Sequence, residues 1–239
     1  MAEPLVLIPG LMCDTRLFAD QIAACAPDRT VTVALPTQGE RMEEIASNLL
    51  DQLPHRFALI GHCIGGGVAM EILRRAPERV QRLALISTSP LADTPQQAAD
   101  RETVIVKARS GQLEEALKAV MPVDVLAPGP GRLGIQARYV EMGLALGPAA
   151  FERQIRALQR RRDQQATLRK IKVPTLLACG THDQMTPVKR HEFMAELIRG
   201  SRFVEMPEAG HLLPIEQPAA LTEALRGWLT APPVPQPVI

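Results

Sequence analysis

A strand–turn–helix segment centred on residue 63 constrains the fold of this chain more than any other feature. The apolar run 57–60 is typical of a buried strand, and residues 66–75 favour a helix. Between them, residues 61–65 read Gly-His-Cys-Ile-Gly, and the two glycines permit a sharp turn packed closely against neighbouring backbone. Such a turn lifts the Cys63 sulfur above a sheet and places it at a helix N-terminus, where the dipole favours a thiolate. The segment therefore predicts a nucleophile at Cys63.

A phosphate-binding loop and a packed cysteine are the alternatives for this turn. The chain contains neither G-x-x-x-x-G-K-[ST] nor G-x-G-x-x-G with an acidic residue about 20 positions further on, which argues against phosphate binding. A small buried apolar residue is the common role of cysteine, and it is the alternative for Cys63. The flanking glycines favour the role of nucleophile for Cys63.

Short apolar runs alternate with helical patterns along most of the chain. This alternation predicts an α/β fold, a doubly wound and mainly parallel sheet of about six strands with helices on both faces. The expected strands are 4–8, 30–35, 57–60, 82–87, 174–179 and 202–206. The expected helices are 14–25, 41–53, 63–75, 187–198 and 218–230. In such sheets reactive groups lie just beyond the carboxyl ends of strands, as Cys63 does in this prediction.

The stretch between the fourth and fifth predicted strands is about 85 residues long and contains no convincing strand pair. Helical windows occur at 94–109, 112–120, 133–146 and 148–170. We therefore expect a helical cap at 91–172 above a core formed by 1–90 and 173–231. The β-branched residues 103–106 fit a helix poorly. The proline-rich residues 232–239 predict an extended tail.

Composition and charge exclude several classes of function. A net charge of +1 over 239 residues gives no concentrated basic face for nucleic acid, and no apolar window of about 18 residues could cross a membrane. The N-terminal residues lack the basic region of a secretion signal, so we expect a cytoplasmic protein. The four cysteines form no recognisable zinc pattern, so we expect neither a metal nor another cofactor. Cys25 and Cys179 are expected to be packed.

A nucleophile needs a general base, and the chain has five histidines. His211 follows the last predicted strand, in a loop that opens at the same edge as the nucleophile, and we predict that it is the base. His62 adjoins the nucleophile and should point away from it, which suggests packing or contact with substrate. His182 fits an ordinary loop position. His55 and His191 are expected at the solvated surface.

The acid that orients the base should follow another strand at the same edge. Asp183, in the loop after 174–179, meets this requirement and completes the order nucleophile, acid, histidine. Its alternative role is a helix N-cap or loop residue. Asp93 also follows a strand at this edge and is the main competitor.

An oxyanion hole requires two backbone N–H groups directed at the developing negative charge. Ile64, directly after the nucleophile, would supply one of them. In the loop after the first strand, Gly10 allows the chain to turn back so that Leu11 offers the second. An ordinary turn is the alternative for this loop. Because the loop must reach the nucleophile, we also expect Cys13 nearby.

Taken together, these segments resemble the α/β-hydrolase superfamily over nearly the whole chain. The matching pieces are Pro9-Gly10-Leu11, 61–66, 174–187, 207–211 and Glu216-Gln217-Pro218. The chain looks most like the small bacterial esterase and lactonase branch with a helical cap. It departs from that branch in lacking the usual N-terminal hairpin and in having Cys63 where serine is usual. Cysteine occupies a similar turn in dienelactone hydrolases and polyhydroxyalkanoate synthases.

The resemblance implies a hydrolase that cleaves small-molecule carboxylic esters or thioesters through an acyl-cysteine intermediate. Cys63, His211 and Asp183 would form its catalytic triad, without a metal or cofactor. Three alternatives stay open: an acyltransferase that uses the same triad, a non-catalytic ligand receptor, and an engineered cysteine replacement in a serine hydrolase.

The resemblance also directs attention to substrate contacts in the cap. His62, Met12, Tyr139 and Met142 are candidate substrate-binding residues, with packing inside the cap as the alternative for the last two. A basic run in the cap could dock an acidic substrate or a carrier protein, although a solvated face is the more common role of such a run. Its members are Arg153, Arg156, Arg160, Arg161 and Arg162.

Overall fold

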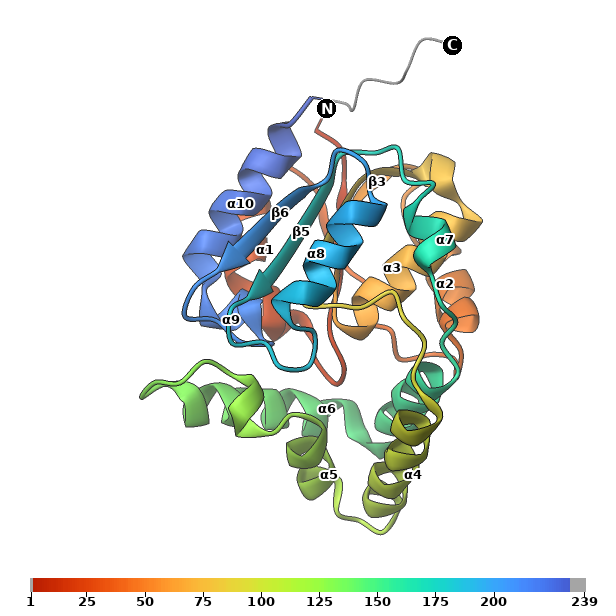
Figure 1. The fold of residues 1–239 in the computed structure, drawn as a ribbon, viewed down its shortest axis with the longest axis vertical. Helices are drawn as coiled ribbons and strands as arrows, with labels where there is room; N and C mark the ends of the chain where they lie inside the picture. Colours follow the sequence, from red (N-terminus) through yellow and green to blue (C-terminus); the bar gives the residue numbers. More distant parts are fainter. Residues whose placement is uncertain (1, 233–239) are drawn as a thin grey trace.

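A computed structural model describes residues 2–232 and contains one six-stranded sheet in the order β2-β1-β3-β4-β5-β6 (Figure 1). All neighbouring strand pairs are parallel. The strands are β1 (Leu5–Ile8), β2 (Val31–Val33), β3 (Phe57–His62), β4 (Val80–Ile86), β5 (Thr175–Gly180) and β6 (Arg202–Met206). The predicted parallel sheet is confirmed.

Helices cover both faces of this sheet, as Figure 1 shows. One face carries α2 (Met42–Leu50), α3 (Ile64–Arg75) and α8 (Val188–Leu197). The other carries α1 (Ala19–Cys25), α9 (Leu213–Glu216) and α10 (Pro218–Thr230), which contact one another. Short 3₁₀ turns lie at η1 (Thr15–Phe18), η2 (Pro77–Arg79) and η3 (Val123–Val125).

The inner strands are continuous apolar runs because helices cover both of their faces. Every residue of β1, β3 and β5 is buried, whereas the edge strands β2 and β6 are largely only partly buried or exposed. Since all strands are parallel, the loops that follow them meet at one edge of the sheet. The segments predicted to form the site are among these loops.

A group of three helices lies beside the carboxyl ends of the strands, in the lower part of Figure 1. It consists of α4 (Pro95–Arg109), α5 (Leu113–Val120) and α6 (Arg132–Gln159), which contact one another, and we call it the cap. The short α7 (Gln165–Leu168) instead contacts α3 and α8. The division into a core of 1–90 and 173–231 and a cap of 91–172 stays a prediction, and α7 packs beside core helices.

Helix α4 contains the β-branched residues 103–106 that fit a helix poorly in isolation. A capping box between Thr94 and Gln97 begins the helix, and Ile105 is fully buried. Tertiary packing and the capping box therefore outweigh the local preference of these residues for an extended conformation.

The segment α6 consists of two helical halves that meet at a kink, in keeping with the two helical windows expected on either side of residue 147. Gly147 has a φ of 80°, outside the helical range, and Pro148 follows it within the same segment. The second half ends at Gln159, so the helix predicted over 148–170 is too long. Residues 160–164 form a connection to α7.

Within residues 2–232, no helix is both long and apolar enough to span a membrane. The tail predicted at 232–239 lies outside the described residues except for its first member.

Candidate active site

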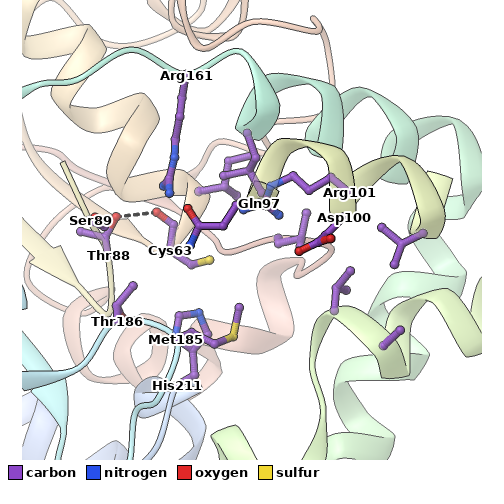
Figure 2. A pocket seen from close by; sticks show the side chains of 16 residues that line it. Cys63, Thr88, Ser89, Gln97, Asp100, Arg101, Arg161, Met185, Thr186 and His211 are labelled. Carbon is purple, nitrogen blue, oxygen red and sulfur yellow. Dashed lines mark hydrogen bonds between the residues drawn. The ribbon is translucent and has the colours of Figure 1, made fainter. Parts of the chain in front are cut away.

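The turn between β3 and α3 presents Cys63 in a strained backbone conformation. Its φ and ψ are 51° and −117°, which residues with a side chain seldom adopt. A Cβ on Gly61 would collide with the Gly65 carbonyl, and a Cβ on Gly65 with the Ile8 carbonyl, so both glycines are needed for this close packing. The Thr88 hydroxyl fixes the turn by donating a 2.7 Å hydrogen bond to the Cys63 carbonyl (Figure 2).

The loops after β5 and β6 bring Asp183 and His211 into direct contact. The Nδ1–H of His211 donates to the two Asp183 carboxylate oxygens, at 3.0 and 2.9 Å. The Thr186 hydroxyl donates to the same carboxylate at 2.7 Å, and the N–H groups of Met185 and Thr186 donate at 2.9 Å. Because both side chains are buried, the carboxylate fixes the tautomer and orientation of the imidazole.

The charges of this cluster stabilise one another. Burial raises the pKa of Asp183, but His211 and the Thr186 hydrogen bonds outweigh burial and lower that pKa to about 2. Burial lowers the pKa of His211, but Asp183 and Cys63 outweigh it and hold the pKa well above its usual value. Burial also opposes ionisation of Cys63, yet His211 is the main group that lowers the pKa of this thiol below its ordinary value. The arrangement favours a thiolate paired with an imidazolium.

The N–H groups of Leu11 and Ile64 lie close enough to Cys63 to help lower the pKa of its thiol. Met12, the next residue in the first loop, has a φ of 53°, and its N–H donates a 2.8 Å hydrogen bond to the Gln154 side chain of α6. A residue of the cap therefore holds the loop that contains Leu11. Sequence reasoning missed Gln154, although it is a polar residue on the otherwise apolar buried face of a helix.

A carboxylate in α9 fixes the loop that contains His211. Glu216 accepts hydrogen bonds from the N–H groups of Gly210 and Leu212, on either side of His211, at 2.8 Å each. It also accepts one from the Ala127 N–H at 2.7 Å. Burial raises the pKa of Glu216 despite these three donors. Apart from the family resemblance, no sequence pattern marks Glu216 for this role.

Two further histidines are buried near the site. His62 donates from Nε2 to the His211 carbonyl at 2.7 Å, and burial together with the neighbouring imidazole lowers its pKa to about 3. His191 in α8 is fully buried, and its Nε2 accepts from the Thr88 N–H at 3.3 Å. The surface prediction for His191 is wrong, because this side of α8 packs against the sheet. His55 is exposed as predicted, and His182 lies in a loop as predicted and is exposed.

A cavity of about 280 Å³ lies between these residues and the cap (Figure 2). The core contributes Leu11, Cys63, Ile64, Thr88, Ser89, Met185, Thr186 and His211. The cap side contributes Gln97, Asp100, Arg101, Val104, Ala119, Val120, Leu158 and Arg161. The structure thus gathers the predicted nucleophile, base and oxyanion residues around one pocket.

The four predicted substrate-binding residues are absent from the lining of this pocket. Met12, His62, Tyr139 and Met142 are all fully buried by neighbouring side chains. The Tyr139 hydroxyl has no hydrogen-bond partner among the described residues, and burial raises its pKa well above the usual value. Their contact with substrate stays a prediction that this pocket does not support.

The remaining cysteines are free and buried. Burial raises the pKa of Cys13, and negative charge on Cys63 raises it further, in keeping with the expected proximity of the two. Burial also raises the pKa of Cys25 and brings that of Cys179 to about 12. Residues 2–232 contain no group of three or more His, Cys, Asp or Glu side chains that could hold a metal ion.

Asp93, the competing candidate for the orienting acid, binds arginines instead of a histidine. Arg101 donates from Nε and Arg161 from Nη2 to its two carboxylate oxygens, at 2.5 and 2.6 Å. The Asp93 side chain is only 1% exposed. The carboxylate in contact with His211 is therefore that of Asp183.

The other arginines of the basic run bind acidic or carbonyl groups. The partners are Glu102 and Glu152 for Arg156, Glu40 for Arg160, Glu43 for Arg162 and the Thr37 carbonyl for Arg153. Several of these contacts tie the cap to the core. A uniformly solvated face is therefore the wrong description of this run, and docking of a carrier protein on it stays a prediction.

Comparison with known proteins places this geometry in a family. The family model described as the alpha/beta hydrolase family matches residues 5–224. The chain belongs to the alpha/beta hydrolase family. A solved structure similar to this α/β-hydrolase is that of a thermophilic esterase from Thermogutta terrifontis. That structure is 25% identical, with a TM-score of 0.85, and the match covers 95% of this chain and 89% of the other.

Relatives of this α/β-hydrolase include ester-cleaving proteins. It is 26% identical to a pimeloyl-[acyl-carrier protein] methyl ester esterase from Nitrosomonas europaea, over 72% of this chain and 71% of the relative. It is 28% identical to a protein of Pseudomonas savastanoi pv. phaseolicola that is provisionally named as the carbamate hydrolase RutD, over 96% of this chain and 95% of the relative.

Proposed function

We propose that this α/β-hydrolase cleaves carboxylic esters through an acyl intermediate on Cys63. The observation that best supports the proposal is the hydrogen bonding of the two ring nitrogens of His211. Its Nδ1 is bound to Asp183, while its buried Nε2 has no hydrogen-bond partner of acceptable geometry among the described residues. This nitrogen is the one left to exchange a proton with Cys63 and with the substrate. The named activities of the relatives, hydrolysis of esters and carbamates, agree with acyl transfer to water.

Acylation begins with attack of the Cys63 thiolate on the ester carbonyl carbon, which forms a C–S bond. The carbonyl electron pair moves onto oxygen, and the N–H groups of Leu11 and Ile64 stabilise the resulting oxyanion. The pair then returns to re-form the carbonyl, and the C–O bond to the alcohol breaks. The His211 imidazolium gives its Nε2 proton to the departing alkoxide, so a neutral alcohol leaves.

Deacylation reverses the proton transfer. Neutral His211 takes a proton from water while the water oxygen attacks the thioester carbon. The C–S bond breaks and the carboxylic acid leaves, which regenerates the thiolate and the imidazolium. Asp183 keeps the imidazole in one orientation through both halves, since its carboxylate is fixed by Thr186 and Met185.

The proposal is tested with 4-nitrophenyl esters of increasing acyl length. Release of nitrophenolate should be lost in Cys63→Ala and retained in Cys25→Ala, a matched substitution of a buried cysteine in α1 that does not line the pocket. Full turnover by Cys63→Ala would show that Cys63 is not the nucleophile.

The same assay decides which acceptor receives the acyl group. With water as acceptor, free acid accumulates at the rate of nitrophenolate release whether or not an added alcohol is present. Formation of a new ester at the expense of the acid would identify an acyltransferase instead. Tight binding of esters without any turnover would identify a receptor and contradict the proposal.

A further inference from the structure

Two arginines line the cap side of the pocket and have no part in the chemistry of Cys63. Arg101 extends from α4 and Arg161 follows α6, and Figure 2 shows both reaching into the pocket on one side of Cys63, with His211 on the other. We propose that this pair binds a carboxylate on the substrate, so that the preferred substrates are monoesters of dicarboxylic acids. The proposal rests on the proposed function of Cys63 and names the substrate class of that site.

Asp93 holds the two guanidinium groups in place. Its carboxylate is 1% exposed and accepts from Arg101 at 2.5 Å and from Arg161 at 2.6 Å. The two arginine side chains are 23% and 20% exposed, so they are largely ordered by the protein and still reach the pocket. Both Asp93 oxygens are occupied, and the residue is not part of the lining. The arrangement is a preorganised pair of cations, which lowers the entropy cost of binding an anion.

Hydrogen-bond donors remain after Asp93 is satisfied. Arg161 binds Asp93 through Nη2, which leaves its Nη1 without a side-chain partner among residues 2–232, while its Nε is buried. Arg101 binds Asp93 through Nε only, which leaves its terminal nitrogens without another partner in the described part of the chain. Guanidinium groups favour carboxylates because two parallel N–H groups match the two oxygens.

Gln97 adds a neutral donor beside the arginines. Its Oε1 accepts from the Thr94 N–H at 2.9 Å in the capping box of α4. The amide oxygen is thereby committed, and the NH₂ group is the end that can donate to a ligand. Figure 2 shows this side chain between the two arginines and Cys63, where it could contact a bound chain.

Asp100 limits how much negative charge the pocket accepts. It also lines the pocket, and its Oδ1 accepts from Gln96 at 2.7 Å. Arg101 and Arg161 carry two positive charges, and Asp93 and Asp100 carry two negative ones. A ligand with one negative charge that reaches the guanidinium groups is favoured over a doubly charged phosphate, which Asp100 would repel.

The pocket between the arginines and the nucleophile is suited to a short hydrocarbon chain. Val104, Val120, Leu158 and Met185 line it with apolar side chains. Its volume of about 280 Å³ matches a small acyl group rather than a long lipid. A dicarboxylic monoester meets these conditions, because its ester lies at Cys63, its methylene groups contact the apolar wall and its free carboxylate meets the arginines.

The test compares two matched series of methyl esters. One series consists of monomethyl esters of dicarboxylic acids of increasing chain length, and the other replaces the free carboxylate by a primary amide of nearly the same size. The enzymes are the wild type, Arg161→Gln, Arg101→Gln and Asp100→Asn. Arg162→Gln is the matched control, because Arg162 is an exposed arginine in the same run that binds Glu43 and does not line the pocket.

We expect the wild type to prefer the acid series. Loss of either pocket arginine should lower kcat/KM for the acid esters about 10- to 100-fold and change the amides about twofold at most. Arg162→Gln should leave both series unchanged, and Asp100→Asn should increase kcat/KM for the acid series alone. Equal losses for the two series, or cleavage of both series by the wild type without a preference for the acids, would overturn the proposal.

Two further measurements keep the outcome interpretable. If a glutamine variant unfolds, Arg161→Lys keeps the charge beside Asp93 but loses the planar pair of donors, and it should still lose rate on the acid esters selectively. If the wild type cleaves neither series, calorimetry of monomethyl glutarate with the Cys63→Ala protein decides. If monomethyl glutarate binds and Arg161→Gln abolishes this binding, the inference is supported although the proposed function fails. If the ester does not bind, or binds equally well in Arg161→Gln, the inference is overturned.

Discussion

Cys63 combines a strained backbone, a helix N-terminus and a neighbouring imidazole at one atom. Burial alone would keep its thiol protonated, but His211 outweighs burial and lowers the pKa. We therefore expect alkylation of Cys63 by iodoacetamide to rise with pH through a midpoint below the usual thiol value of about 8.5. His211→Gln should move this midpoint upward. A midpoint that does not change in His211→Gln would show that the imidazole is not coupled to the sulfur.

Asp183 contacts a histidine and Asp93 contacts two arginines, so removal of each negative charge should have a different effect. Asp183→Asn should slow acylation clearly, but by less than the factor of about 10⁴ seen in serine triads, because a thiol ionises more easily than a hydroxyl. The rate of the nitrophenolate burst measures this step.

Asp93→Asn should leave acylation of a neutral ester nearly unchanged. It removes the negative charge between Arg101 and Arg161, so we expect a loss of about 2 kcal/mol in the free energy of unfolding. Denaturant unfolding measures the loss. A large fall in the burst rate with Asp93→Asn, together with little effect of Asp183→Asn, would reverse the assignment of the orienting acid.

At the scale of single elements, the turn before α3 depends on backbone packing that a methyl group disrupts. A Cβ at Gly65 would collide with the Ile8 carbonyl of β1, so Gly65→Ala should destabilise the protein by about 1–3 kcal/mol. Gly67, two residues further on, has space for a Cβ in ordinary contact with Met42. Gly67→Ala should instead stabilise α3 by about 0.5–1 kcal/mol, because alanine favours a helix. Unfolding curves in urea that show equal effects for the two variants would contradict this account of the turn.

The elements that could be predicted from sequence are those with a local physical cause. The buried strands are apolar runs, and the turn at Cys63 has its own glycine pattern. The conformation of residues 103–106 was harder to predict. Their β-branched side chains favour a strand locally, whereas the capping box and the burial of Ile105 favour the helix α4. The surface assignment of His191 failed for the same kind of reason, since only the packing of α8 shows which side is covered.

Site residues that depend on contacts between distant segments could not be predicted. Gln154 holds the loop of Met12, and Asp93 holds Arg161, across long stretches of chain. No local pattern signals such partners. The contact between His211 and Asp183 could be predicted, because parallel strands bring their following loops to one edge of the sheet and position along the chain is then informative.

At the scale of the whole molecule, the buried pair of Asp183 and His211 links stability to pH. The pKa of Asp183 is lowered to about 2 in the folded protein. Its contribution to the free energy of unfolding is therefore complete above its pKa in the unfolded chain, about 4, and is lost as the pH falls toward about 2. This contribution is on the order of 2 kcal/mol. The pKa of His211 is raised in the folded protein. Its contribution to the free energy of unfolding is complete below its pKa in the unfolded chain, about 6.5, and is lost only as the pH rises through the raised pKa.

Urea unfolding at about pH 5 and about pH 3 should therefore show a larger loss of stability on acidification for the wild type than for Asp183→Asn, which lacks this titration. Equal losses for the two proteins would mean that the Asp183 carboxylate is not stabilised in the fold as described.

Rapid-quench intact-mass spectrometry can detect the acyl group on Cys63 during turnover. The protein is mixed with excess 4-nitrophenyl ester, quenched in acid at successive times, and digested to locate the added mass. We expect one acyl adduct on the peptide that contains Cys63, formed with the nitrophenolate burst and decaying at the rate of turnover once substrate is exhausted. Turnover with no adduct, or an adduct on another residue that forms and decays at the rate of turnover, would contradict an acyl intermediate on Cys63.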